Sequence, residues 1–496
     1  MTDAAKPTAA LLKKSVAAIM CVVLIVTGGF YPGTVRAAET AEETAEESSE
    51  EMTEESSEGI SEEAAEETPR APSSTILATK YYTNCNGTQW IDWYLICDPY
   101  DNLYISRGLK YKIFICNFPN AMKYKFGVRK NGDILAVYRS ELSKAVTEEY
   151  GPELDDVRKN PRVLLCSERY RVIHEVPFGD YHPDTGEGLK PSGWLENCGF
   201  CSLPNGDVVF VEYTRMGVVF TANCWRIEAG SDPTDANSWK VVKQFQVAKN
   251  DDEYYDESVI EHFHTAQVDP YTGIVYIATG DYKNKAQMWY SRDNGRTWEQ
   301  QTFTDPYTGN TLTSSEKYFR ILNYNFTEDA VYWSSDSSQN HAIFKCSRAE
   351  SGELDPDSIE VLVELDMIEG HPATYGTVYY PEYNFMVLME RCDWTTESML
   401  FRVYDLDDDS VKEIDTIYVA GDEPRNVGFR TEYTEFIPTD GKIKVGFGNN
   451  VRYRNYNDLC GNPGDSDWTN NINNLWIEVY RDEDGEITVD YGYYEI

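Results

Sequence analysis

The chain has 496 residues, with 84 acidic against 44 basic side chains and a formal net charge of −40. Such an acidic surface repels nucleic acids and anionic lipids, so the composition argues against partners of either kind. The length and a hydrophobic content of 41% are sufficient for a large buried core.

The N-terminal segment has the three parts of an export signal. Lys13 and Lys14 precede an apolar run, residues 15–30, and small residues around Ala37 offer a cleavage site. We predict that residues 1–38 are a signal peptide whose removal leaves no membrane span. The alternative is a retained membrane anchor, but the apolar run is short for a bilayer. The protein is therefore expected to be secreted or to lie on the cell surface.

Residues 39–73 differ in composition from the rest of the chain. Fourteen Glu side chains occur between positions 39 and 67, among Ala, Ser and Thr and almost no large apolar residues. Like charges without apolar partners cannot form a core, so we predict a disordered, extended spacer. The folded domain would then comprise residues 74–496, held away from a cell surface by the spacer.

From residue 74 onwards one pattern recurs, in which a turn of Asn, Asp or Gly type precedes a short β-rich run. From the third unit on, the turns are about 54 to 67 residues apart, a spacing typical of a four-stranded blade. The runs are apolar on both faces, as expected for strands between two neighbouring sheets. The units begin at residues 101, 131, 205, 272, 328, 382 and 440.

This rhythm predicts an all-β fold, a β-propeller of six or seven blades. The stretch Thr75–Tyr82 is expected to add an outer strand to the last blade and so to close the ring. The alternative is one or two β-sandwiches. Regular spacing over the whole region, without a linker, favours the propeller.

The octet 291–298 reads Ser-Arg-Asp-Asn-Gly-Arg-Thr-Trp and predicts a specific turn. Ser291 and Asp293 can hydrogen-bond to the backbone of their own turn. Gly295 permits a positive φ that a side chain would resist. Trp298 is placed to bury its ring between neighbouring sheets.

With Thr297, the octet fits the pattern Ser-x-Asp-x-Gly-x-Thr-Trp. This pattern resembles the Asp-box, or BNR repeat, of the sialidase-like β-propellers. The resemblance covers one blade well, residues 261–300, and the other blades only as a rhythm. It implies a structural role for the octet, at an outer turn of the blade and away from the ligand-binding face.

In a propeller, the start of each blade's first strand and the end of its second strand meet at one rim, where ligands bind. Glu261, His262 and His264 enter the blade that carries the octet, and two residues of one strand that are two apart share a face. Paired imidazoles suit a divalent metal, a proton shuttle or an acidic sugar. We predict catalytic roles for His262 and His264, together with His371 and Tyr375 of another blade.

Polar residues at matching places in other blades are predicted to bind substrate. Arginines in an otherwise acidic protein favour a carboxylated ligand. The cofactor stays open, because no specific motif supports a divalent metal. The predicted substrate-binding residues are Glu261, Arg215, Asp281, Arg320, Arg391, Arg430 and Arg452.

The resemblance implies glycan recognition, but the chain lacks the Phe/Tyr-Arg-Ile-Pro motif of sialidases. The nearest match, residues 318–322, reads Tyr-Phe-Arg-Ile-Leu and lies in a different blade. We therefore predict a secreted, monomeric propeller that binds or degrades a carboxylate-bearing extracellular glycan. The chemistry would be that of a glycoside hydrolase or a polysaccharide lyase. The alternative is a non-catalytic propeller that binds a glycan or a protein.

Overall fold

In the computed structural model, the described residues are almost all β-strands and the turns that connect them. The predicted signal peptide and spacer lie outside them, so both stay predictions. None of the helices in the described part is long and apolar enough to span a bilayer. The structure describes residues 74–83, 90–98, 100, 102–117, 124–129, 134–138, 162–166, 173–179, 188–189, 191, 197–214, 220–247, 259–281, 286–337, 341–365, 374–391, 398–418, 429–431, 443–447 and 475–493.

Seven sheets of four or five strands follow one another along the described residues, and neighbours in each sheet are neighbours in the chain. The first sheet contains β1 (Thr75–Thr83), β2 (Trp90–Cys97), β3 (Asn102–Arg107) and β4 (Tyr111–Asn117). The second contains β5 (Tyr124–Val128), β6 (Ile134–Tyr138), β7 (Arg162–Cys166) and β8 (Ile173–Glu175). The third contains β9 (Phe200–Ser202), β10 (Val208–Val211), β11 (Thr221–Ile227), β12 (Trp239–Val247) and, in parallel to β12, β13 (Val259–Ile260).

The remaining four sheets repeat the antiparallel, four-stranded arrangement. The fourth contains β14 (His262–Val268), β15 (Val275–Gly280), β16 (Met288–Ser291) and β17 (Glu299–Gln301). The fifth contains β20 (Ile321–Phe326), β21 (Ala330–Ser335), β22 (Ala342–Ser347) and β23 (Glu360–Glu364). The sixth contains β24 (Thr374–Tyr380), β25 (Phe385–Arg391), β26 (Ser398–Asp405) and β27 (Ser410–Tyr418). The seventh contains β28 (Phe429–Thr431), β29 (Ile443–Phe447), β30 (Leu475–Arg481) and β31 (Ile487–Tyr493).

A few short elements connect these sheets. The strands β18 and β19 form a small hairpin, and two 3-10 turns and one helical turn occur among the described residues. Ser315 caps the helical turn, since its hydroxyl accepts a hydrogen bond from the backbone N–H of Tyr318. The bounds are β18 (Phe303–Thr304), β19 (Thr311–Leu312), η1 (Asn197–Gly199), η2 (Ala236–Ser238) and α4 (Glu316–Phe319).

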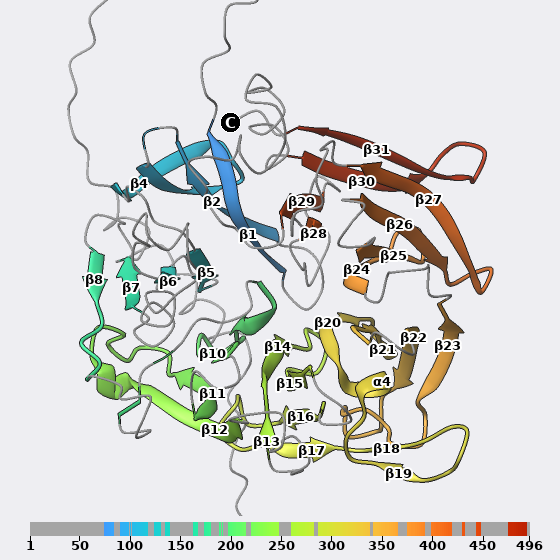
Figure 1. Ribbon diagram of the computed structural model, residues 1–496, viewed down its shortest axis with the longest axis horizontal. Helices are drawn as coiled ribbons and strands as arrows, with labels where there is room; N and C mark the ends of the chain where they lie inside the picture. The colour runs from blue at the N-terminus through green and yellow to red at the C-terminus, as the bar shows by residue number, and fades with distance from the viewer. Residues whose placement is uncertain are drawn as a thin grey trace, which may run out of the picture. The chain divides into compact units, whose positions relative to one another are not determined.

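The first strand of each sheet contacts the first strand of the next, from β1 through β5, β9, β14, β20 and β24 to β28. Figure 1 shows these strands towards the middle of the unit and the fourth strands at its periphery. Seven such sheets among the described residues make this fold a seven-bladed β-propeller. The all-β propeller prediction is confirmed, at the upper of the two blade numbers.

One prediction is corrected. The segment Thr75–Tyr82 pairs with β2 and is the innermost strand of the first sheet, whereas the seventh sheet has its own outer strand, β31. The error arises because a single strand pattern carries no information about which edge of a sheet it will occupy. The run that follows residue 101 is the third strand of its sheet.

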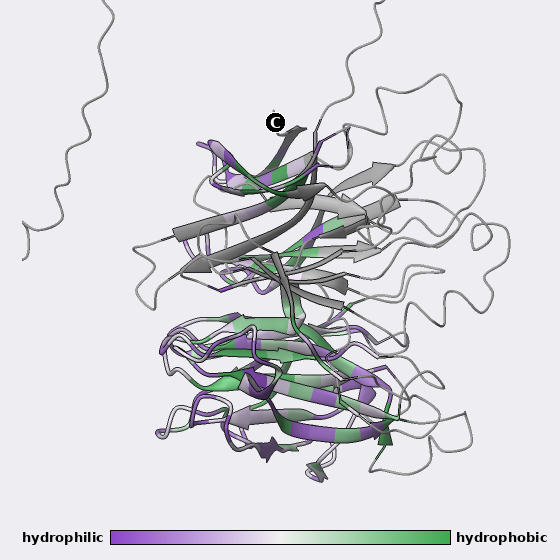
Figure 2. Cartoon of the chain, turned by 90° about the vertical axis from the view of Figure 1, so that its left-hand side faces the viewer, coloured by the Kyte–Doolittle hydropathy of each residue, from purple (hydrophilic) through white to green (hydrophobic). Residues whose placement is uncertain are grey.

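The core lies between the sheets, as the apolar runs predict. Every residue of β15 is buried, and side chains alternate between its two faces. Val275 and Ile277 pack towards the third sheet, whereas Tyr276 and Ala278 pack towards the fifth. Figure 2 shows hydrophobic residues along the strands and more hydrophilic residues at the turns. The fourth sheet is therefore held by apolar contacts on both of its faces.

Side-chain amides connect the innermost strands β14, β20 and β24. Among the described residues, no strand pairs with the edge of each that faces away from its second strand. Gln267 in β14 donates to the carbonyl of Tyr324 at 3.3 Å and accepts from its N–H at 2.7 Å. Asn323 in β20 makes the same pair of bonds to Thr377 of β24, at 2.8 and 3.2 Å. A primary amide presents the same donor and acceptor as a peptide group, so it can satisfy a free strand edge.

The octet 291–298 forms the turn from β16 to β17 with the expected hydrogen bonds. Asp293 accepts from the N–H of Thr297 at 2.8 Å, and Ser291 accepts from the N–H of Gly295 at 2.8 Å. Gly295 has a φ of +76°, and a Cβ there would lie 2.6 Å from Val209. Trp298 packs, partly buried, against the apolar cluster between the third and fourth sheets.

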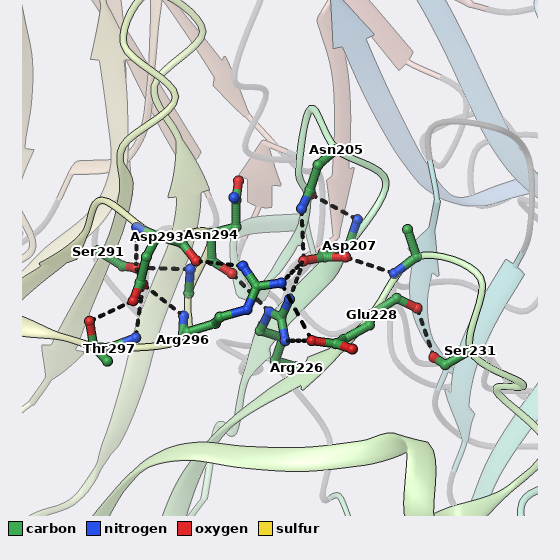
Figure 3. Close-up of polar contacts among 12 residues, drawn as sticks. Asn205, Asp207, Arg226, Glu228, Ser231, Ser291, Asp293, Asn294, Arg296 and Thr297 are labelled. Carbon is green, nitrogen blue, oxygen red and sulfur yellow. Dashed lines mark hydrogen bonds and ion pairs between the residues drawn. The ribbon is translucent and has the colours of Figure 1, made fainter.

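An arginine fastens this turn to the preceding sheet (Figure 3). The Arg226 side chain in β11 donates to the backbone carbonyl of Asn294 at 2.9 Å and pairs with Asp207 and Glu228. Because Arg226 is 4% exposed, these partners are needed to compensate for the burial of its charge. The turn thus links two blades at the strand ends opposite those where His262 lies.

Loss of one inter-sheet amide should destabilise the propeller. In the Asn323→Ala variant, both the N–H and the C=O of Thr377 lose a partner, so we expect the free energy of unfolding to fall by about 2–4 kcal/mol. Urea denaturation measures this free energy of unfolding. Asn237→Ala removes an exposed amide that bonds only within its own turn and should change stability by less than about 0.5 kcal/mol. Equal effects of the two variants would refute the role given to the inter-sheet amides.

The octet turn should make stability sensitive to acid. Burial alone would raise the pKa of Asp293, but hydrogen bonds from Thr297, Ser291 and Arg296 outweigh it and lower the pKa from 3.8 to about 2. The carboxylate therefore stabilises the fold above pH 3.8, and this contribution is lost as the pH falls towards 2.

The matching experiment compares Asp293→Ala with the unaltered chain by denaturation at several pH values. The variant should lose about 2 kcal/mol of stability at pH 7, and the difference should shrink between pH 4 and pH 2. The exposed Glu350→Ala serves as control and should show no such trend. A difference for Asp293→Ala that is independent of pH would contradict this account.

Candidate functional site

Two adjacent strand ends of the fourth sheet bring two imidazoles and a carboxylate together. His262 begins β14 and pairs with Gly280, the last residue of β15, so Asp281 follows directly beside it. Nε2 of His262 lies 3.0 Å from Oδ2 of Asp281, and Nε2 of His264 lies 3.2 Å from Oδ1. We call His262, His264 and Asp281 the imidazole–carboxylate cluster.

The preceding sheet orients His262. Its Nδ1 lies 3.1 Å from the backbone carbonyl oxygen of Thr214, and its ring is 4.0 Å from the ring of Tyr213 between centroids. A carbonyl can only accept a hydrogen bond, so Nδ1 carries the proton. The Nε2 atom then faces the carboxylate of Asp281.

A β-bulge and a glycine position His264. The register between β14 and β15 shifts between Phe263 and Thr265, so His264 has no partner opposite and its side chain is re-aimed. A Cβ on Gly280 would lie 1.9 Å from Nε2 of His264. The imidazole therefore lies directly against the backbone of Gly280, in space that any other residue would fill.

Asp281 adopts an uncommon backbone conformation, with φ at +54°. Aspartate tolerates this left-handed region better than most residues do. Burial alone would raise the pKa of Asp281, but the charges and hydrogen bonds of His262 and His264 outweigh it and hold the pKa well below 3.8. The carboxylate is therefore ionised at physiological pH, with its two oxygens directed at different partners.

The fifth sheet contributes Arg320, which precedes β20. Its guanidinium lies 2.6 Å from Asp281, 3.3 Å from Asp336 and 3.4 Å from Glu316. The sequence predicts that Arg320 binds a substrate carboxylate; in the structure it contacts three carboxylates of the chain itself. Three carboxylates of the described residues therefore surround this guanidinium.

Four of the predicted site residues thus meet at one place: His262, His264, Asp281 and Arg320. Glu261 lies next to them, half-buried, with its backbone carbonyl accepting from the hydroxyl of Thr214 at 2.6 Å. The remaining predicted residues stay predictions. The structure does not describe Arg215, His371 and Arg452, and it describes the strands but not the side chains of Tyr375, Arg391 and Arg430.

Asp336, Glu316 and Gly280 are not among the predicted site residues. Asp336 directly follows β21, the second strand of its sheet, as Asp281 follows β15. The positional rule that indicates Asp281 would therefore have found Asp336 as well. Glu316 lies four residues before Arg320, a spacing at which opposite charges pair on a helix. Gly280 carries no comparable signal, because its role depends on the space around one ring.

The cluster suits two kinds of chemistry. An imidazole held by a carboxylate can take up and release a proton near neutral pH. Two imidazoles and one carboxylate are also a common set of ligands for a transition metal. Both imidazoles are nearly inaccessible to solvent, with His262 at 2% and His264 at 1% exposure.

No protein-family model matches the chain, and no curated protein matches it. Among solved structures, it is similar to the Dos1 propeller (10% identity, TM-score 0.40, 74% of this chain and 79% of that chain covered). It is also similar to a Bacteroides fragilis NCTC 9343 protein provisionally named a 6-phosphogluconolactonase (11% identity, TM-score 0.41, 84% and 93% covered). A third is TolB from Acinetobacter baumannii (9% identity, TM-score 0.32, 70% and 64% covered). Similarities this weak assign no function to the chain.

The geometry predicts that Gly280→Ala disrupts the cluster. The added methyl group would collide with the imidazole of His264 and push it away from Asp281. Nitrogen NMR of histidine-labelled protein should show a changed environment for His264. Gly179→Ala is the matched control, because a Cβ there meets no atom within 4 Å. Unchanged imidazole signals in Gly280→Ala would contradict the placement of the ring.

Proposed function

We propose that this propeller binds or degrades a carboxylate-bearing glycan outside the cell, at the rim where the imidazole–carboxylate cluster lies. The main support is the convergence of His262, His264 and Asp281 at the inner strand ends of one blade. Ligands commonly bind at this rim of a propeller. The predicted export signal and the resemblance to sialidase-like propellers support an extracellular glycan as the ligand.

Of the two enzymatic alternatives, the side-chain chemistry favours a lyase over a hydrolase. Glycoside hydrolases commonly use two carboxyl groups that flank the scissile bond. Here both oxygens of Asp281 face cationic or imidazole groups, and Asp336 and Glu316 pair with Arg320. β-Elimination instead needs a base at the carbon next to the carboxylate and a cation that neutralises that carboxylate. An imidazole is a suitable base, and Arg215 or Arg452 would supply the cation.

The burial of both imidazoles favours the second candidate, a non-catalytic propeller. With His262 and His264 at 2% and 1% exposure, the cluster would then hold the rim in shape while neighbouring side chains bind the glycan or a protein. This alternative makes the same rim the binding site but requires no chemical change in the ligand.

The experiment exposes the purified full chain to a panel of acidic and neutral glycans. Unsaturated uronate products, detected by their ultraviolet absorbance, would identify a lyase. New reducing ends without that absorbance would identify a hydrolase, and retention on a glycan array without either product would identify a binder. Failure to act on or retain any carboxylate-bearing glycan would refute the proposal.

Variants connect the outcome to the site. Asp281→Asn and His264→Gln should lower the rate or the affinity for the glycan at least about 100-fold, the usual effect of removing a group that takes part in proton transfer. The control Glu350→Gln removes an exposed carboxylate from the β22–β23 turn, at the opposite strand ends, and should behave as the unaltered chain. Equal behaviour of all three would place the function elsewhere on the propeller.

A further inference from the structure

We propose that His262, His264 and Asp281 bind one divalent transition-metal ion. Three donor groups from two strands, two imidazole nitrogens and a carboxylate oxygen, lie within 4.8 Å of one another. All three residues lie at the same strand ends of the fourth sheet. This inference goes beyond the proposed function and does not depend on it, because metal binding is measured in the absence of any glycan.

The spacing of the donor atoms fits a coordination sphere. Metal–ligand bonds of about 2.0–2.1 Å place adjacent ligand atoms about 2.9–3.4 Å apart, in octahedral or tetrahedral geometry. Asp281 Oδ2 lies 3.0 Å from Nε2 of His262, and Asp281 Oδ1 lies 3.2 Å from Nε2 of His264. Both separations fall in this range, but they end on different oxygens of Asp281. The three donor atoms lie within 4.8 Å of one another, so the side chains would draw closer together around an ion.

The ligands also have the outer support that metal sites require. Nδ1 of His262 donates to the carbonyl of Thr214, which leaves Nε2 as the metal-binding atom. Arg320 holds the carboxylate of Asp281 at 2.6 Å and is itself held by Asp336. Two of the three ligands, His262 and Asp281, are therefore oriented by groups outside the set of ligands.

Buried polar atoms without hydrogen bonds provide the independent observation. Among the described residues, Nε2 of His262 and Nδ1 of His264 are buried, and neither has a partner in hydrogen-bond geometry. Such atoms are costly unless another partner satisfies them. A metal ion bound to Nε2 of His262 would satisfy that atom.

Charge favours a divalent ion in particular. Among the described residues, three carboxylates surround Arg320, and this acidic surrounding favours a dication over an anion. Imidazole ligands select transition metals such as Zn²⁺ over Mg²⁺ or Ca²⁺, which prefer oxygen ligands. Three protein ligands leave at least one position for water or for a ligand carboxylate. If the proposed function also holds, the ion would supply a cation for the glycan's carboxylate.

The test is a calorimetric titration of the chelator-treated full chain with Zn²⁺, in excess Mg²⁺ to occupy non-specific carboxylates. We expect one Zn²⁺ per chain. Asp281→Asn keeps the shape of the side chain and a residue type that tolerates positive φ, and it should weaken binding at least about 100-fold. His264→Gln should do the same, whereas Glu350→Gln should bind as the unaltered chain does.

A second measurement needs no variant. X-ray absorption of the Zn²⁺-loaded full chain should show two imidazole ligands and oxygen ligands at about 2.0–2.1 Å. Absence of stoichiometric binding above the Mg²⁺ background would overturn the proposal. So would undiminished affinity in both Asp281→Asn and His264→Gln, or a spectrum without imidazole ligands.

Discussion

In the part of the chain that the structure describes, the innermost strand of every blade has one edge without a strand partner, and the fold depends on how that edge is satisfied. Apolar packing can hold two sheets face to face, but it does not fix their relative height. Gln267 and Asn323 do so, because each binds both polar groups of one peptide residue on the next blade. Buried amides with such specific partners exclude a sliding movement, since any shift would leave several polar groups unpaired.

The candidate site follows from this constraint. His262 and Asp281 are neighbours because β14 and β15 are hydrogen-bonded, with His262 opposite Gly280. Arg320 reaches Asp281 only because β20 is held beside β14, and Gln267 is one of the residues that hold it there. The cluster is thus built from secondary structure inside one blade and completed by the contact between blades.

Much of the fold could be predicted from the sequence, because strand runs and their turns are local patterns. The positions of His262 and Asp281 at a shared rim also follow from strand order alone. The bulge at His264 could not be predicted, since it appears only in the pairing of two strands. The pairing of Arg320 with Asp281 and Asp336 could not be predicted either, because these ion pairs join segments that are remote in sequence. The predicted role of Arg320 in binding a substrate carboxylate stays a prediction.

The left-handed backbone at Asp281 has a genetic consequence. Aspartate and asparagine both adopt this conformation readily, and a single base change in the codon converts one into the other. A single nucleotide change can therefore remove the negative charge of residue 281 from the rim without changing the backbone conformation at that position. Related sequences that differ at this position alone would be expected to share the architecture and to differ in the ligands they retain.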